Sequence, residues 1–423
     1  MIADTSTPVV VVACPHHGGL GVTRSLGRLG IPVYVVDSNR WAPALYSRYC
    51  RGRFIWNLNN APAEKSLEFL AGVARKAGRR CLLIPGTDSA AIFVSAHAAA
   101  LEPWYILPAQ NSALVPSLCS KTHMHGLARR FQIPTPTTFS LQTRPERLEC
   151  LKKMDLPIII KGIEVPPRRS GSQARKLIIR SRQQLLALYD VIGNATVHDL
   201  IAQEYIPGGE DTVWMFNGYF NAHSECLAGF TGKKLRQCPP YTGVTSLGVC
   251  HTNDAVEQTA KKFLKAIGYR GIVDMDFRYD ARDGEYKLLD VNPRIGSTFR
   301  LFVSKDGMDV ARAAYLDLTG QPFAPAPLWH GRKWIVEDFY LAAAFRYYRD
   351  GMLTFREWLK SLRGIQESAF WASDDRLPTL LMLRADLSEF FKRVKRRLRA
   401  SMALKNKRRA SMVSACGEKN YCA

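Results

Sequence analysis

Two acidic residues and an asparagine near residue 280 have the types and the spacing of a divalent-cation site. Residues 272–279 and 286–291 have the pattern of β-strands, and a turn-forming segment separates them. Asp276 lies in the first predicted strand and Asp290 in the second, so antiparallel pairing can bring both carboxylates to one face. Such carboxylates repel each other unless a cation lies between them or one is protonated. Asn292 points to the same face and completes an all-oxygen set suited to Mg²⁺ or Mn²⁺.

Arg294 places a fixed positive charge beside this set. Pro293 ends the second strand, and the guanidinium that follows can bind a phosphate or an oxyanion. The alternative is an ordinary hairpin whose acids are solvated and whose arginine pairs with one of them. The acids interrupt strongly apolar runs, which favours the cation site.

A basic segment lies upstream, in and after another apolar strand. Lys161 closes the predicted strand 156–162, where a lysine must either extend to solvent or meet an anion. Residues 166–173 are rich in small residues and carry two arginines, and a strand is predicted at 176–180. The backbone N–H groups of such a loop could fold over phosphates, and a mobile basic hairpin tip is the alternative.

A third candidate element spans residues 200–211. An apolar strand runs here into a Pro-Gly-Gly bend. Such a bend leaves main-chain groups free to pair with the edge of an adenine ring.

These segments resemble the ATP-grasp ligases. An acid before Phe277, followed after a short hairpin by Asp-Val-Asn-Pro-Arg at 290–294, is similar to the metal-binding end of that family. Most members have Glu at both acidic positions, whereas this chain has Asp, which is one methylene shorter. Lys121, before a short helix and an Ile-Pro-Thr-Pro turn, is similar to the start of the family's ATP-binding region.

The resemblance implies a role for each matching residue. Asp276, Asp290 and Asn292 would hold two Mg²⁺ ions, and Arg294 and Lys161 would be catalytic because they stabilise the transferring phosphoryl group. The residues implied to bind ATP are Lys121 and Lys161 at the phosphates, Glu204, Tyr205 and Ile206 at the adenine, and Glu210 at the ribose. Asp211 is an alternative to Glu210 at the ribose, since the bend could slip by one residue.

The implied reaction begins with attack of a carboxylate on the γ-phosphate of ATP, which gives an acylphosphate and ADP. An amine then displaces phosphate to form an amide. Asp88 after its strand, and the segment 229–237, look most like the D-aspartate-ligase and carbamoyl-phosphate-synthetase-like carboxylate–amine ligases. Plain surface charge is the alternative for the basic residues of 229–237. The candidate substrate-binding residues are Lys233, Arg236, Ser297 and Arg300.

The elements expected to position these residues begin with an α/β unit. An apolar strand at 8–13, a glycine-rich turn at 16–21 and a helix at 22–29 precede a strand that closes on Asp37, which is typical of a Rossmann-like half. Dinucleotide binding is one interpretation. However, Arg24 occupies the place of a third glycine, and only one such unit is visible.

The α/β rhythm then repeats, with a strand at 81–85, a helix at 89–101 and a short strand at 105–108. The predicted fold class is therefore α/β. An N-terminal Rossmann-like domain precedes a two-subdomain ATP-grasp α+β fold, with a helical C-terminal extension. The predicted domains are 1–115, 116–325 and 326–423.

Several elements are predicted inside and after the ATP-grasp region. Strands 212–216 and 220–223 are expected to form a hairpin that turns at Asn217-Gly218. Helices are predicted at about 123–131, 254–267, 334–348 and 353–362, the last with Thr354 as its N-cap.

Composition bounds the function class. The 423 residues carry a net charge of +22, which favours anionic partners. The ten cysteines show neither a CxxC motif nor zinc-type spacing, as expected for a reduced, cytoplasmic protein. No signal peptide is apparent, and no apolar run reaches the ~18 residues of a membrane helix. An integral membrane protein is not expected.

The C-terminal region is strongly basic. Residues 384–409 carry eleven Lys or Arg and two acidic residues, so they contribute 11 − 2 = +9 to the net charge. A basic amphipathic helix of this kind could lie peripherally on the inner face of an anionic membrane or bind acidic macromolecules, and a solvated tail is the alternative. Small carboxylate and amine substrates are the expected partners, a homodimer is a further option, and no nucleic-acid motif is present.

Two other function classes stay open. An NAD(P)-dependent oxidoreductase would use the N-terminal turn but would leave the 276–294 pattern unexplained. A non-catalytic binding protein with a degenerate ATP site, recruited through its basic tail, is compatible with Asp at both acidic positions.

Overall fold

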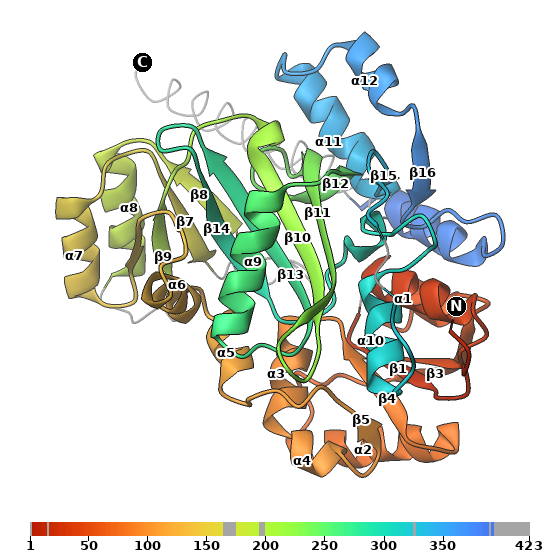
Figure 1. The fold of residues 1–423 in the computed structure, drawn as a ribbon. Coiled ribbons are helices and arrows are strands. Elements are labelled where there is room, and N and C mark those ends of the chain that lie inside the picture. Colours follow the sequence, from red (N-terminus) through yellow and green to blue (C-terminus); the bar gives the residue numbers. More distant parts are fainter. Residues whose placement is uncertain are drawn as a thin grey trace, which may run out of the picture.

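The protein is built from three β-sheets and the helices that cover them (Figure 1). The computed structural model describes residues 2–14, 17–163, 175–193, 199–324, 327–388 and 391–392. The predicted phosphate loop at 166–173 and most of the basic tail lie outside the described residues. None of the helices in these ranges is long and apolar enough to cross a membrane.

The N-terminal sheet is parallel, with strand order β3-β2-β1-β4-β5. The four valines of β1 are fully buried, as expected for a strand covered on both faces. Its elements are β1 (Val9–Val12), α1 (His17–Gly27), β2 (Val33–Asp37), β3 (Cys50–Ile55), α2 (Ala63–Ala77), β4 (Cys81–Pro85), α3 (Asp88–Ala96), α4 (Ala98–Leu101) and β5 (Tyr105–Ile106).

The predicted glycine-rich turn is instead the first turn of α1, which begins at His17. The glycines are used for packing. A Cβ on Gly18 would lie 3.1 Å from the Cα of Ser297, and a Cβ on Gly19 would lie 2.6 Å from the Cβ of Cys14. Protein atoms therefore occupy the space that small residues open here, which explains the glycines without a dinucleotide.

A four-stranded sheet with order β6-β9-β7-β8 forms a separate lobe (Figure 1). Two short helices connect this lobe to the N-terminal sheet, α5 (Leu114–Cys119) and α6 (Lys121–Arg130). The elements of the lobe are β6 (Thr138–Ser140), α7 (Arg144–Lys153), β7 (Ile158–Ile163), β8 (Arg175–Ile179), α8 (Arg182–Ile192) and β9 (Ile201–Glu204).

The central sheet has seven strands in the order β14-β13-β10-β11-β12-β15-β16. Helix α9 covers one face, and α10 packs on β10, β11 and β13. Its elements up to residue 318 are η2 (Glu210–Thr212), β10 (Val213–Phe220), β11 (Cys226–Cys238), β12 (Val244–Cys250), α9 (Asp254–Ala266), β13 (Gly271–Asp280), β14 (Glu285–Asn292), η3 (Phe299–Leu301) and α10 (Val310–Leu318).

The predicted turn at Asn217-Gly218 is wrong, because β10 runs unbroken through it. Asn217 is fully buried and donates to the carbonyl of Val273 on the neighbouring strand at 3.4 Å. Gly218 is needed because a Cβ there would lie 2.7 Å from the Phe216 ring. The chain turns later, where the side-chain oxygen of Asn221 accepts two backbone N–H groups.

The C-terminal extension is part strand and part helix, which corrects the prediction of a helical extension. It consists of β15 (Lys333–Ile335), α11 (Glu337–Arg349), α12 (Phe355–Ser361), β16 (Ile365–Ser368) and a helix over 377–388. The two strands extend the central sheet beyond β12. Thr354 caps α12 as predicted, in a reciprocal arrangement with Glu357.

Candidate active site

The β13–β14 hairpin brings the predicted metal residues to one face of the central sheet. Asp276 lies opposite Asp290, and Asp274 lies opposite Asn292. Side chains two residues apart on a strand share a face, so all four point into one cavity between the lobes. Asp274 was not predicted, although its position two residues before Asp276 was a sufficient signal.

Three lysines from three different elements surround Asp290. The Nζ of Lys121, at the start of α6, lies 2.7 Å from one carboxylate oxygen. The Nζ atoms of Lys161 on β7 and Lys176 on β8 lie 3.7 and 3.8 Å from the other. Burial alone would raise the pKa of Asp290, but these three ammonium groups hold it well below its usual range. Three cations thus face one anion in a buried space.

Lys161 is held at the junction between the two sheets. Its side chain is buried, and its ammonium group donates to the carbonyl of Leu289 on β14 at 3.3 Å. Burial lowers the pKa of Lys161 to about 8, although Asp290 opposes this effect. The predicted lysine at the end of an apolar strand therefore meets an anion rather than solvent.

A fourth lysine belongs to this group and was not predicted. Lys234 on β11 lies 2.7 Å from Asp276 and lines the cavity, whereas its neighbour Lys233 lies over the ring of Trp214, 4.5 Å from the centroid. Adjacent residues on a strand point to opposite faces. Of these two lysines, Lys234 therefore faces the cavity and Lys233 faces the other side of the sheet.

The cavity offers oxygen ligands that fit Mg²⁺ or Mn²⁺. Among the described residues, no three His, Cys, Asp or Glu side chains are grouped closely enough to hold a metal. A site built on Asp276 and Asp290 would therefore need the Asn292 oxygen and oxygens of a ligand, which suits a hard cation bound with phosphate. Burial and the neighbouring Asp276 raise the pKa of Asp274 to about 6, so negative charge is already crowded on this face.

The residues predicted to bind adenine lie at the end of β9 and directly after it. Glu204 and Ile206 line an adjoining cavity, which Lys161, Lys234 and Asp276 also line. Glu204 accepts a hydrogen bond from the backbone N–H of Thr137 and forms an ion pair with Arg282. Glu204 is therefore held as a structural link between the small lobe and the hairpin turn.

Tyr205 and Glu210 line a further open cavity beside this one, together with Arg236. Glu210 accepts weak hydrogen bonds from Gln237 and from the backbone N–H of Tyr241, at 3.4 and 3.3 Å. Its other carboxylate oxygen is buried and has no hydrogen-bond partner among the described residues, and burial raises the pKa of Glu210 to about 7. An unpaired acceptor beside the predicted adenine position suits a ribose hydroxyl. Arg236 lies over the ring of Tyr347, apart from the lysine cluster.

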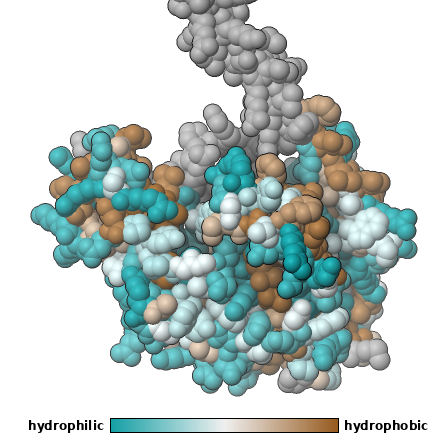
Figure 2. All heavy atoms as spheres, turned by 90° about the horizontal axis from the view of Figure 1, so that it is seen from above, coloured by the Kyte–Doolittle hydropathy of each residue, from teal (hydrophilic) through white to brown (hydrophobic). Residues whose placement is uncertain are grey.

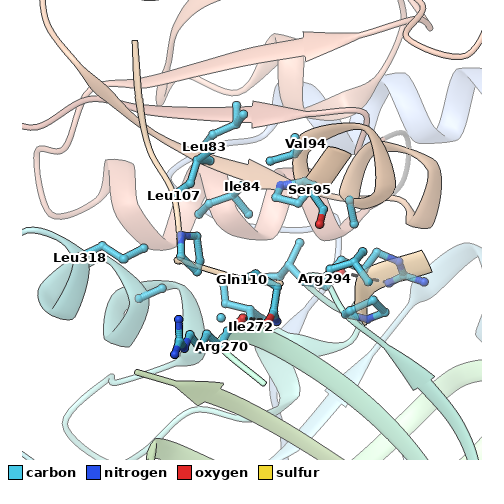
Figure 3. A pocket seen from close by; sticks show the side chains of 18 of the residues that line it. Leu83, Ile84, Val94, Ser95, Leu107, Gln110, Arg270, Ile272, Arg294 and Leu318 are labelled. Atoms are coloured by element: carbon cyan, nitrogen blue, oxygen red, sulfur yellow. Dashed lines mark hydrogen bonds between the residues drawn. The ribbon is translucent and has the colours of Figure 1, made fainter. Parts of the chain in front are cut away.

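Arg294 lines both the cavity that holds Asp276 and Asp290, here called the reaction cavity, and an apolar pocket next to it. Figure 3 shows Arg294 at the apolar pocket. Its guanidinium pairs with Asp88 at 2.6 Å and lies 3.4 Å from the Asn292 oxygen. The apolar pocket lies between the N-terminal sheet and the start of β13, and side chains such as Ile84 and Ile272 line it. Asp88 therefore fixes the direction of Arg294, while apolar groups pack behind it.

The last two substrate candidates have different surroundings. Ser297 lines the reaction cavity beside Arg294. Arg300 points away into a buried network, where it pairs with Asp309 at 2.6 Å and with Glu367 at 2.7 Å. The structure thus corrects the prediction for Arg300: its contacts are those of a residue that joins the extension to the core.

Known proteins resemble the chain in sequence and in fold. It is 26% identical to D-aspartate ligase of Enterococcus faecium (strain Aus0004) over 288 residues, which cover 65% of this chain and 68% of the relative. It is also 26% identical to D-alanine–D-alanine ligase of Bartonella bacilliformis over 193 residues, or 44% of this chain and 56% of that protein. In sequence, the chain is thus similar to ATP-grasp carboxylate–amine ligases. No protein-family model matches it.

Solved ATP-grasp structures agree in fold. N5-carboxyaminoimidazole synthetase from Staphylococcus aureus has a TM-score of 0.58 at 11% identity, covering 79% of this chain and 83% of that one. L-amino acid ligase from Bacillus licheniformis has a TM-score of 0.55 at 14% identity, covering 74% of each chain. At these identities the likeness concerns the fold.

Proposed function

We propose that this ATP-grasp protein activates a carboxylate as an acylphosphate, releases ADP and joins the carboxylate to an amine in an amide bond. The observation that supports this most is the placement of Lys121, Lys161 and Lys176 around Asp290 at the junction of the two sheets. The excess positive charge suits a polyphosphate, and phosphoryl transfer needs mainly positioning and charge neutralisation.

Each group has a defined task in this proposal. Asp276, Asp290 and Asn292 would hold Mg²⁺, which supplies neutralisation of phosphate charge when bound. Lys121 and Lys161 exchange their contacts with Asp290 for phosphate oxygens. The predicted adenine site is formed by Glu204, Tyr205 and Ile206, and Glu210 receives the ribose.

The carboxylate substrate is proposed to bind at the other end of the cavity. Arg294, oriented by Asp88, binds the attacking carboxylate or the oxyanion that forms on it. Ser297 lies next to this position and packs against the start of α1. The names of the relatives favour an amino acid as one substrate. Contact of the basic tail with an anionic membrane, and a homodimer, remain predictions.

The test is analysis of nucleotide products with Mg²⁺·ATP and pools of amino acids and small carboxylates. We expect ADP and phosphate only with a particular carboxylate–amine pair. AMP and pyrophosphate would mean an adenylate intermediate and would overturn the mechanism. Failure of the protein to bind ATP would overturn the nucleotide site itself.

A variant pair localises the activity. Asp290→Asn should abolish Mg²⁺-dependent turnover, because it removes a charged oxygen at the proposed metal. Asp283→Asn, in the exposed turn of the same hairpin, should leave turnover unchanged. Equal rates for the two variants would rule out the metal assignment, and circular dichroism shows whether both are folded.

A further inference from the structure

The exposed apolar side chains of the described residues are concentrated in the C-terminal extension. Of 21 large apolar residues that are exposed in this part of the chain, 13 lie between Leu341 and Phe391. Isolated exposed apolar residues are normal on a protein surface, but a concentration of them marks an interaction site. Figure 2 looks onto the end of the molecule where α11 lies and shows hydrophobic groups at its surface.

Helix α11 carries part of this surface as a stripe. Leu341, Phe345 and Tyr348 are 64%, 59% and 49% exposed, and their spacing of four and three residues places them on one side of the helix. The opposite side is already used, since Tyr340 and Tyr347 pack into the core. The exposed stripe is thus additional to the face that the fold buries.

The helix over 377–388 carries a second stripe. Leu377, Leu380, Leu383 and Leu387 are 47%, 59%, 49% and 58% exposed, while Met382 is buried on the other side. Their spacing of three, three and four residues keeps them within about a third of the helix circumference. This helix also has more apolar surface than its packing uses.

Aromatic and basic groups continue the second stripe. The guanidinium carbon of Arg384 lies 4.9 Å from the ring centroid of Trp41, which is 46% exposed. The two helices pack against the same core cluster, which contains Met382 of the second helix and Val336, the residue before α11. The two stripes therefore lie on helices that share one core cluster.

The charges around the stripes indicate the occupant. Arg346 and Arg349 lie beside the stripe of α11 and are exposed, and both also pair with Asp350. The sequence after the second stripe is the most basic of the chain, with a net +9 over 384–409. Apolar residues flanked by arginines are typical of helices that lie in the headgroup region of an anionic bilayer, with each guanidinium at the phosphates.

We propose that the extension docks the protein peripherally on an anionic lipid bilayer through these two stripes. A second copy of the chain fits less well, because it would place the same basic surfaces against each other. The docking is independent of the proposed ligase reaction. It would hold the cavity near substrates carried at a membrane surface.

The experiment is sedimentation of the full chain with vesicles of phosphatidylcholine alone or mixed with phosphatidylglycerol. We expect binding to the mixed vesicles, weakened by salt, and little binding to phosphatidylcholine. Leu380→Ser/Leu387→Ser and Leu341→Ser/Phe345→Ser should each weaken partitioning ~10-fold or more, because each removes two inserted apolar side chains. Such exposed substitutions should leave the melting temperature nearly unchanged.

A matched control lies in the small lobe. Leu186→Ser/Val191→Ser removes two apolar side chains from α8 that are 47% and 86% exposed, and it should leave vesicle binding unchanged. The proposal is overturned if the wild-type chain does not bind mixed vesicles, or if the stripe variants bind them as well as wild type does. It is also overturned if light scattering shows a dimer that the stripe variants dissociate.

Discussion

At the scale of single residues, the site depends on which face of a strand each side chain takes. Lys234 contacts Asp276 in the cavity, and Lys233 stacks on Trp214 on the other face. Lys234→Met should therefore lower kcat of the ligase reaction by ~100-fold or more, since a charge near the phosphates is lost. Lys233→Met, the neighbouring control, should retain near wild-type kcat. Comparable losses in both variants would contradict this assignment.

Burial of the ionised Asp37 carboxylate lowers the free energy of unfolding by an amount that depends on pH. Its side chain is 1% exposed, and one of its oxygens has no hydrogen-bond partner in the part of the chain that the structure describes. Burial raises the pKa of Asp37 to about 6 against the opposing effect of backbone N–H groups. The folded state thus binds this proton more tightly than the unfolded state, so stability is present below about pH 4 and is lost as pH rises through 6.

Asp37→Asn should therefore stabilise the protein at pH 8 by up to about 3 kcal/mol, the equivalent of two pKa units. At pH 3 the two proteins should unfold at nearly the same urea concentration, because Asp37 is then mostly protonated in both states. Urea denaturation across this pH range measures the difference. A stabilisation that does not change with pH would mean that burial of the charge is not its cause.

Contacts within one short hairpin could be predicted from the sequence, whereas contacts between distant segments could not. Asp276 and Asp290 were predicted to face each other because one short hairpin pairs them, and the strand register confirms this. Lys176 and Lys234 were missed because they reach the site from β8 and β11 through pairings that the local sequence does not specify. The contacts of Arg300 were not predicted in full, because one of its two partners, Glu367, is 67 residues away.

At the scale of elements, the same distinction between local and distant causes applies. The alternating or apolar runs predicted β1, β4, β13 and β14 within one or two residues. Asn217-Gly218 failed as a turn signal because a buried strand position, where no Cβ fits beside Phe216, also requires glycine. The strands β15 and β16 were missed because they are short and complete a sheet whose other strands lie far upstream.

Helix α11 also positions the segment beside the proposed nucleotide site. The Tyr347 hydroxyl accepts the backbone N–H of Tyr241 at 3.0 Å, and the same N–H approaches Glu210. Tyr347→Phe should raise KM for ATP several-fold with a smaller effect on kcat, because the segment that holds Glu210 loses one anchor. Tyr348→Phe, one residue along on the exposed side, should leave both constants unchanged. An unaltered KM in the first variant would show that the segment is fixed without α11.

At the scale of the whole molecule, the extension is fastened to the N-terminal domain by ion pairs of two kinds. Arg24 on α1 pairs with Asp375 at 2.9 Å, and both side chains are at most 4% exposed. Arg28, one turn later, pairs with Asp374 at the same distance, but these side chains are 30% and 38% exposed. The two neighbouring aspartates therefore make similar contacts in different dielectric surroundings.

Asp375→Ala should be strongly destabilising, by about 3–5 kcal/mol, because it leaves the Arg24 guanidinium buried without its countercharge. The same change also removes acceptors for Ser47 and for the backbone N–H of Arg48. Asp374→Ala should cost about 1 kcal/mol or less, since solvent screens that pair. Urea denaturation of both variants provides the comparison. Equal losses of stability would mean that burial does not set the strength of these contacts. A small loss in both would mean that the extension is held mainly by β15 and β16 in the central sheet.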